Sequence, residues 1–237
     1  ALPAIFNPED LNALEQALRL KDAHPGSTVT ILTMGPGRAA DIIREGLFRG
    51  ADNGYLLTDR AFAGADTLAT SYALATAIRK IGDCDIIIGG RQAIDGDTAQ
   101  VGPQIAEKLH LPQVSYVEEV VEAAADHVVV KRQFEDGYHI IKIKTPCLLT
   151  AIAELATPRY MSVRGIVEAY EKEIKVLGFE DLKDGLELDM IGLKGSPTNV
   201  YQSFTKEVKG AGTILEGLSA DEAVKAIMDK LEAKFII

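Results

Sequence analysis

The sequence predicts an α/β protein in which helices cover a doubly wound, mostly parallel sheet. Short apolar runs alternate with longer amphipathic segments through the first half of the chain. Glycine and proline lie between these segments, as in the turns that join strands to helices. After Pro112 several strand-like segments follow one another, and we expect these to be antiparallel additions to the sheet. An alternation of strands and helices predicts parallel pairing with helices on both faces.

The first half of the chain contains three expected strands and four expected helices. Asn7 or Asp10 is suited to cap the first helix, with Pro8 in its first turn. The expected strands cover residues 29–34, 55–57 and 86–88, and the other expected helices cover residues 38–46, residues 67–81 and a segment that begins at Ala99 or Gln100. Loops that follow parallel strands gather at one edge of the sheet, which is where ligands of such folds bind.

The second half begins with β-rich segments and then becomes less regular. Strands are expected at residues 114–121, 127–133, 139–144 and 147–152. Residues 1–153 would form the α/β domain. We interpret residues 154–218 as an extended arm that packs on another subunit, and the alternative is a poorly ordered surface tail. Residues 219–237 are expected to form a C-terminal helix capped by Ser219.

The composition argues against several classes of protein. The 35 acidic and 25 basic residues give a net charge of −10, which argues against nonspecific nucleic-acid binding. The sequence shows no apolar run of the length that a membrane-spanning helix needs. Cys84 and Cys147 lie beside apolar runs, so we expect buried free thiols in a reducing compartment, the cytoplasm. The four histidines show no metal-ligand spacing and are expected at the surface or in loops, so no metal site is predicted.

Residues 86–111 carry the strongest signal for a ligand. An apolar strand ends at Gly89 and Gly90, a polar loop follows, and an amphipathic helix begins after the loop. The first N–H groups of a helix have no partner within the helix and lie at the positive end of its dipole, so this arrangement binds phosphate. The two glycines would let a ligand approach the backbone. The spacing is neither GxGxxG nor a P-loop, and the alternative is an ordinary strand-to-helix loop.

Four motifs identify a family. They are Asn7-Pro8 before the first helix, Gly35-Pro36 after a strand, the run Gly-Arg-Gln-Ala-Ile-Asp-Gly-Asp at residues 90–97, and Pro158-Arg159-Tyr160. With these motifs the chain resembles the small (β) subunit of electron transfer flavoproteins over nearly its whole length, and the run at residues 90–97 is the most specific. Members of that family begin with a short strand upstream of the Asn-Pro motif. We expect that strand to belong at the centre of the sheet and to be missing from this sequence.

The resemblance implies a Rossmann-like fold that binds an adenine nucleotide. Ordinary members hold AMP in this subunit, whereas electron-bifurcating members hold FAD. The segments AGADTLATS (residues 63–71) and GRQAIDGDTAQVGP (residues 90–103) look like the bifurcating members. Asp66, Thr67, Thr70 and Ser71 would offer a second helix N-terminus to a further phosphate or a ribityl chain, although Asp66 could simply be a helix cap. Gly96 would remove a side chain near a pyrophosphate.

The implied cofactor-binding residues come from these loops and helix starts. They are Asn7, Asp10, Met34, Gly35, Asp66, Thr67, Thr70, Gly90, Arg91, Gln92, Ala93, Ile94, Asp95, Gly96, Asp97, Thr98, Gln100 and Val101. Pro8 and Glu9 carry over with them by position. Arg91 is expected either to lie near a flavin ring or to pair with a phosphate or a surface acid. No side chain is predicted to act as an acid, base or nucleophile, because the flavin carries the chemistry.

The resemblance also implies partners. NADH would be the electron donor to FAD on this subunit, ferredoxin or flavodoxin would be one acceptor, and FAD on the α subunit would pass electrons to an acyl-CoA dehydrogenase-type or other flavin dehydrogenase. The alternative is a subunit that holds structural AMP and docks a dehydrogenase. A stand-alone nucleotide-binding stress protein shares the fold, but the long region after residue 154 argues against it.

A docking segment for the dehydrogenase is implied just after the Pro-Arg-Tyr motif. Its predicted contact residues are Tyr160, Met161, Val163 and Arg164. Met161 and Val163 are apolar side chains on a polar stretch and would act as anchors, while Arg164 would lie at the rim. The alternative is that Val163 packs into the core of this chain.

Overall fold

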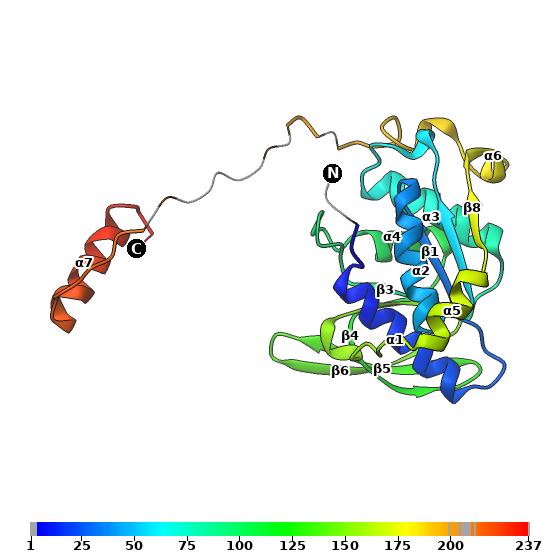
Figure 1. The fold of residues 1–237 in the computed structure, drawn as a ribbon, viewed down its shortest axis with the longest axis horizontal. Coiled ribbons are helices and arrows are strands. Elements are labelled where there is room, and N and C mark those ends of the chain that lie inside the picture. Colours follow the sequence, from blue (N-terminus) through cyan, green and yellow to red (C-terminus); the bar gives the residue numbers. More distant parts are fainter. Residues whose placement is uncertain (1–3, 199, 203, 205–209, 211, 237) are drawn as a thin grey trace. The chain divides into compact units, whose positions relative to one another are not determined.

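The computed structural model describes residues 4–198, 200–202, 204, 210 and 212–236 (Figure 1). Contacts divide the chain into two units, residues 1–199 and residues 200–237. In the second unit the main element is helix α7 (Ala220–Glu232), whose N-cap is Ser219, as predicted. The Ser219 hydroxyl accepts from the Glu222 N–H and the Glu222 carboxylate accepts from the Ser219 N–H, which is a capping box.

The first unit contains eight strands and six α-helices among its described residues. In chain order they are α1 (Pro8–Ala23), β1 (Thr30–Met34), α2 (Ala40–Arg49), β2 (Asn53–Leu57), α3 (Thr67–Ile81), β3 (Ile86–Gly90), α4 (Val101–Leu109), β4 (Gln113–Ala123), β5 (His127–Phe134), β6 (Gly137–Lys144), β7 (Cys147–Ala151), α5 (Val163–Glu171), β8 (Ile174–Leu177) and α6 (Phe179–Leu182). The α/β fold class is therefore confirmed, and the predicted bounds of α3 match those of the structure.

The strands form two sheets, of three and five strands. The first has the order β1-β2-β8 with parallel pairs, and the second has the order β3-β7-β4-β5-β6. In the second sheet β7 pairs parallel with β3 and with β4, whereas β4–β5 and β5–β6 are antiparallel. The expectation of antiparallel additions is confirmed for β5 and β6, holds for β4 only in its pairing with β5, and is wrong for β7. Strand β7 lies between β3 and β4 in the sheet and runs in the same direction as both.

Neighbouring residues of strands β2 and β7 enter cores on opposite faces, so these two strands are covered on both sides. In β2, Leu56 packs with α1, α2 and α5, while Leu57 packs with α3 and α6. In β7, Leu149 lies in the core that includes Ala13 of α1, while Leu148 packs against α4. Side chains alternate between the faces of a strand, so consecutive apolar residues require apolar cover on both sides.

The region after residue 154 differs from the predicted arm. Residues 154–198 belong to the first unit, β8 pairs parallel with β2, and α5 packs on α2. Ala169, Leu182 and Ile191 of this region are buried. The prediction missed these elements because α5 is short and β8 has only four residues, so neither gives a clear periodicity in the sequence. Both are stabilised by contacts with residues far away in the sequence.

Two predictions about single residues are also corrected. Cys147 is buried, and burial raises the pKa of its thiol to about 11, but Cys84 is exposed. His127 lies on β5 with a side chain that is only 12% exposed, in contact with Asp126 and Glu122, so it is neither a loop residue nor a freely exposed one.

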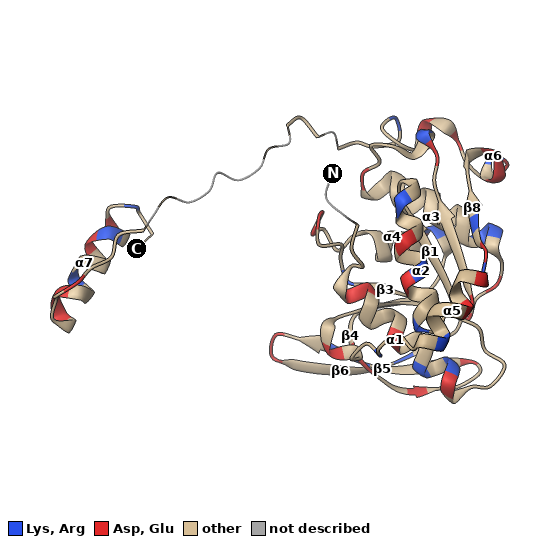
Figure 2. Ribbon diagram, viewed as in Figure 1, with Lys and Arg blue, Asp and Glu red and all other residues tan. Residues whose placement is uncertain are grey.

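Figure 2 shows that basic residues are interspersed with acidic ones along α2 and α5, so neither helix presents a basic stripe of the kind that binds nucleic acid. Within the described part of the chain, the helices are too short or too polar to cross a membrane. The same residues contain no cluster of three or more His, Cys, Asp or Glu side chains able to hold a metal ion.

Candidate functional site

The loop after β3 is tied to the first turn of α1. The Gly90 N–H donates to Asp10 Oδ1 at 2.6 Å. Asn7 Nδ2 donates to the Gln92 carbonyl at 2.9 Å, and the Ile94 N–H donates to Asn7 Oδ1 at 3.2 Å. Asn7 precedes α1 as predicted, but its side chain makes no capping bond and holds the loop instead. The structure thus brings together five of the predicted site residues.

Arg91 lies between α1 and Tyr116 of β4. Its Nη2 is 3.0 Å from Glu9 Oε1, and its guanidinium carbon is 5.6 Å from the centre of the Tyr116 ring. Glu9 also accepts from the Gln92 N–H at 3.2 Å, so this carboxylate fixes both the guanidinium and the loop backbone. Arg91 Nε is buried without a hydrogen-bond partner among the described residues. Arg91 thus pairs with a partly buried acid of α1, and its expected position near a flavin ring stays a prediction.

Helix α4 begins beside the N-terminus of α3. Thr67 Oγ1 donates to Gln100 Oε1 at 2.8 Å, and one turn later Ser71 Oγ donates to Gln104 Oε1 at 2.9 Å. Gln100 is the N-cap residue of α4 but makes no side-chain capping bond, so the first N–H groups of α4 have no side-chain cap among the described residues. Pro103 has no N–H and the Gln104 N–H donates to the Gln100 carbonyl at 3.0 Å, so the N–H groups of Val101 and Gly102 are the donors left at the positive end of this helix.

The N-terminus of α3 is already satisfied by Asp66. Its Oδ1 accepts from the N–H groups of Leu68 and Ala69 at 2.9 and 3.1 Å, and its Oδ2 accepts from the Thr198 N–H at 3.1 Å. Burial alone would raise the pKa of Asp66, but these N–H bonds outweigh it and lower the pKa below its ordinary value. The alternative interpretation of Asp66 as a helix cap is therefore confirmed. A phosphate at this helix end would be repelled by the Asp66 carboxylate and would have to displace it from these N–H groups.

Gly90 and Gly96 have different surroundings. A Cβ on Gly90 would lie 2.8 Å from the Asp10 N and 3.0 Å from the Glu9 carbonyl carbon, so the close approach made here is that of α1 and not of a ligand. A Cβ on Gly96 would meet nothing within 4 Å. Space for a ligand beside the loop is therefore available at Gly96, while Gly90 is needed to seat the loop against α1.

The other predicted residues are spread over several elements, and Met34 and Gly35 contact β2 rather than the loop after β3. Met34 ends β1, the Gly35 N–H donates to the Leu57 carbonyl at 3.1 Å, Thr70 lies in the first turn of α3, and Val101 starts α4. The loop residues Ala93, Asp95, Asp97 and Thr98 are exposed. Asp97 has a positive φ of 54°, and its N–H donates to the Ala93 carbonyl at 2.9 Å, which makes the loop a closed turn.

Three residues of this region escaped the sequence analysis. Tyr116 lies against Arg91 with a positive φ of 60°, at a bulge in the β4–β7 pairing. Bulges that re-aim a side chain are common beside functional sites, but a tyrosine within a strand-like run gives no signal of one. Ser196 and Thr198 contact Asp66 from 130 and 132 residues away. Their sequence, Ser196-Pro197-Thr198, indicates a turn but gives no sign of this partner.

The segment predicted to dock a partner lies at the surface. Tyr160 is 97% exposed and Val163 is 81% exposed, while Met161 is partly buried. Ser162 caps α5 by accepting from the Gly165 N–H at 2.9 Å, and Arg164 pairs with Glu168 at 2.5 Å. The alternative in which Val163 packs into the core does not agree with this exposure.

The comparison with known proteins identifies the family. Residues 1–182 match the electron transfer flavoprotein domain. The chain belongs to the electron transfer flavoprotein family. Among its relatives, the caffeyl-CoA reductase–Etf complex subunit CarD of Acetobacterium woodii is 50% identical over 236 residues, covering 100% of this chain and 89% of the relative. The acryloyl-CoA reductase electron transfer subunit gamma of Anaerotignum propionicum is 52% identical over 242 residues, with 100% and 90% covered. The electron transfer flavoprotein subunit beta of Clostridium acetobutylicum is 51% identical over 236 residues, with 100% and 89% covered.

Membership in this family implies a flavin or nucleotide cofactor, and the residues present fit one. The N–H groups of Val101 and Gly102 at the start of α4 suit a phosphate, and a Cβ on Gly96 in the preceding loop would meet nothing within 4 Å. Asn7, Glu9 and Asp10 hold the loop in place from the other side. Among the described residues, a hydrogen-bonded loop beside a helix N-terminus without a side-chain cap is the feature best suited to an adenine nucleotide.

Proposed function

We propose that this chain is the β subunit of a heterodimeric electron transfer flavoprotein that binds FAD and takes part in electron bifurcation. The carrying observation is the uncapped N-terminus of α4 beside the fixed loop of residues 90–97, with open space at Gly96. Relatives named as electron transfer subunits of caffeyl-CoA and acryloyl-CoA reductases, each about half identical, support the same assignment. When bound, the flavin would supply the electron-transfer chemistry.

The residues of this chain would bind and orient that cofactor. The first N–H groups of α4 would hold a phosphate, and the Thr67–Gln100 bond keeps α3 beside this helix end. Arg91 is fixed by Glu9 and Tyr116, and its buried Nε–H has no partner in the described part of the chain. Its positive charge would stabilise an anionic ligand. Because Asp66 caps α3, its carboxylate would set the limit of the phosphate site on that side.

The proposed complex connects one donor with two acceptors. NADH would donate two electrons as a hydride, one electron would leave to ferredoxin or flavodoxin, and the other would leave through FAD on the α subunit to an acyl-CoA dehydrogenase-type or other flavin dehydrogenase. The exposed Tyr160 and Val163, with Met161 and Arg164, would meet that dehydrogenase. An NADH donor and thiols that are free in the structure agree with a cytoplasmic location.

The alternative function is a subunit that holds AMP as a structural piece. The observation that favours it is the cap of α3 by Asp66, which leaves only one of the two neighbouring helix N-termini for phosphate. AMP carries one phosphate and FAD carries two, so the flavin would need to place its second phosphate along the loop rather than at α3.

A coupling assay tests the bifurcating function. The purified complex, its dehydrogenase and ferredoxin are mixed with NADH, and ferredoxin reduction is followed with and without the acceptor substrate of the dehydrogenase. We expect ferredoxin reduction only when that acceptor is present, because the two electrons must leave by separate routes. NADH oxidation that reduces the acceptor fully while ferredoxin stays oxidised would contradict the proposal.

A further inference from the structure

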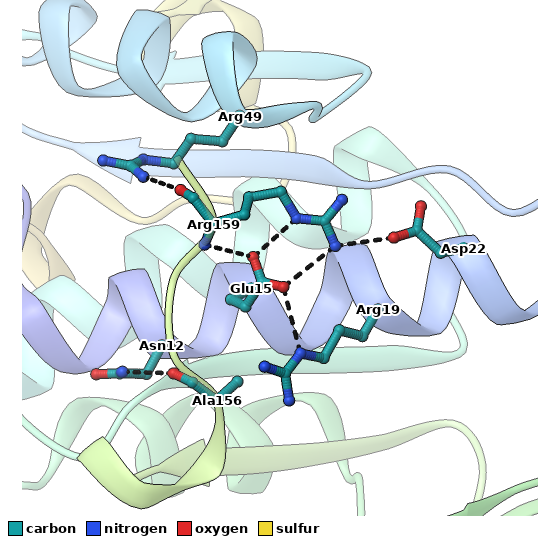
Figure 3. A network of polar contacts seen from close by, with 7 residues as sticks. All are labelled: Asn12, Glu15, Arg19, Asp22, Arg49, Ala156 and Arg159. Atoms are coloured by element: carbon teal, nitrogen blue, oxygen red, sulfur yellow. Dashed lines mark hydrogen bonds and ion pairs between the residues drawn. The ribbon is translucent and has the colours of Figure 1, made fainter. Parts of the chain in front are cut away.

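Helix α1 carries a second group of contacts beyond its first turn. The first turn holds the loop after β3, and the following turns hold residues 156–159, which lead into α5 (Figure 3). Asn12 Nδ2 donates to the Ala156 carbonyl at 2.7 Å. Asn12 is buried, so this bond satisfies a polar side chain and fixes the segment at its start.

Glu15 and Arg159 form the centre of this second group. Glu15 Oε2 accepts from the Arg159 N–H at 3.0 Å and from Arg159 Nε at 2.9 Å, and Glu15 Oε1 accepts from Arg159 Nη2 at 3.1 Å. Arg159 Nη2 also donates to Asp22 Oδ2 at 2.8 Å. Glu15 is only 5% exposed. Bidentate bonds between a guanidinium and a carboxylate are strong and fix orientation, and here they fix the backbone as well.

Both partners stay charged at neutral pH. Burial acts to raise the pKa of Glu15, but the hydrogen bonds and the charge of Arg159 outweigh burial and lower that pKa. The hydrogen bond to Glu15 raises the pKa of Arg159, and the hydrogen bond to Asp22 raises it further. From the other side, Arg49 of α2 donates to the Arg159 carbonyl at 2.5 Å. Arg159 is therefore held by α1 through its side chain and N–H, and by α2 through its carbonyl.

The fixed residue directly precedes the exposed apolar ones. Tyr160 follows Arg159 and is 97% exposed, and Val163 at the start of α5 is 81% exposed. An exposed anchor on a mobile segment loses conformational entropy when it binds, whereas an anchor on a segment already fixed loses less. By fixing the segment before Tyr160, the contacts of Arg159 can therefore raise the affinity of the exposed apolar residues for a partner, although Arg159 adds no apolar surface itself.

We infer that Arg159 is a positioning residue that preorganises residues 160–163 for the flavin dehydrogenase. Arg159 fixes this segment on helix α1, and the first turn of the same helix holds the loop of residues 90–97. This inference rests on the docking role proposed above. Arg159 itself touches neither the dehydrogenase nor the cofactor in this account.

The test compares four variants of this chain in the intact complex with its α subunit: Arg159→Gln, Arg159→Lys, Arg19→Gln and Val163→Asp. Arg159→Gln removes the charge and the bidentate bonds. Arg19→Gln is the matched control, because Arg19 pairs with the same Glu15 at 3.3 Å but does not contact residues 156–163 among the described contacts. Val163→Asp tests docking directly. Three quantities are measured: the rate of chymotryptic cleavage after Tyr160, the dissociation constant for the dehydrogenase, and the bound nucleotide content.

For Arg159→Gln we expect about tenfold faster cleavage and about tenfold weaker dehydrogenase binding, which corresponds to about 1.4 kcal/mol, with unchanged nucleotide content. Arg19→Gln should change none of these quantities appreciably, and Arg159→Lys should recover part of the affinity because it keeps the charge. If Val163→Asp weakens binding and Arg159→Gln does not, the positioning inference is wrong and docking stands. If Val163→Asp leaves binding unchanged, the docking proposal fails, and the inference fails with it. A loss of nucleotide in Arg159→Gln would show a general structural role and overturn the inference.

Discussion

Two glycines of the same loop have opposite roles at the scale of single residues. Gly90 lies where a Cβ would collide with the backbone of α1, and Gly96 lies where a Cβ would meet nothing. From the sequence, both glycines were expected to leave room for a ligand. That interpretation fits Gly96 only, because a glycine in a sequence does not show which neighbour requires it.

Gly90→Ala should destabilise the protein, whereas Gly96→Ala should not. Backbone atoms of α1 would have to move to accept a Cβ at residue 90, at a cost of about 1–3 kcal/mol in the free energy of unfolding. The open position at residue 96 should stay within about 0.5 kcal/mol of the parent. Urea unfolding of both variants measures the difference, and equal stability of the two would contradict the seating of the loop against α1.

The Asp66 cap gives a pH dependence with a definite sign. Its folded pKa is lowered by N–H donors that outweigh burial, so the carboxylate stabilises the fold fully above its ordinary pKa of 3.8, and this contribution is lost as the pH falls through the lower folded value. Asp66→Ala should cost about 1 kcal/mol at pH 7. Asp66→Asn keeps a capping oxygen that does not titrate, so its stability should equal or exceed that of the parent at the lowest pH at which both still fold. A difference between parent and Asp66→Ala that grows as the pH falls below 3.8 would contradict this account.

At the scale of elements, local patterns predicted helices and strands well and predicted their pairing less well. Helix α3 matches its predicted bounds because Asp66 caps its start and Gly82 follows its end. Strand β7 was recognised as a strand, but its parallel pairing with β3 and β4 depends on residues far away in the sequence. Strand β8 was missed because four residues, two of them exposed, give no clear alternation.

Helix α1 shows the same limit for the site. The Asn-Pro start and the polar loop after β3 were both predicted, and the family resemblance grouped them. The bonds of Asn7, Glu9 and Asp10 to that loop, and the Glu15–Arg159 pair further along, join residues 80 to 144 positions apart. Such contacts arise from the packing of α1 across β3, which no local pattern specifies.

At the scale of the whole molecule, this chain contains a proposed nucleotide site, an exposed apolar segment and a C-terminal unit of its own. In the first unit, α1 contacts the loop of residues 90–97 through Asp10 and contacts Arg159 through Glu15, and Arg159 directly precedes the exposed Tyr160. In the second unit, α7 exposes Val224, Ile227 and Met228 on its described surface. The relatives' names describe parts of larger complexes, which agrees with a chain that functions with partners.

The most direct test of the central claim, that this chain holds FAD, is the nucleotide content of the purified complex with the α subunit. Acid-released nucleotides are separated by chromatography and counted against protein concentration. Two FAD per heterodimer, without AMP, is the predicted result, because the α subunit is proposed to hold one FAD and the N-terminus of α4 in this chain the other. One FAD and one AMP per heterodimer would contradict the claim and favour the structural AMP subunit.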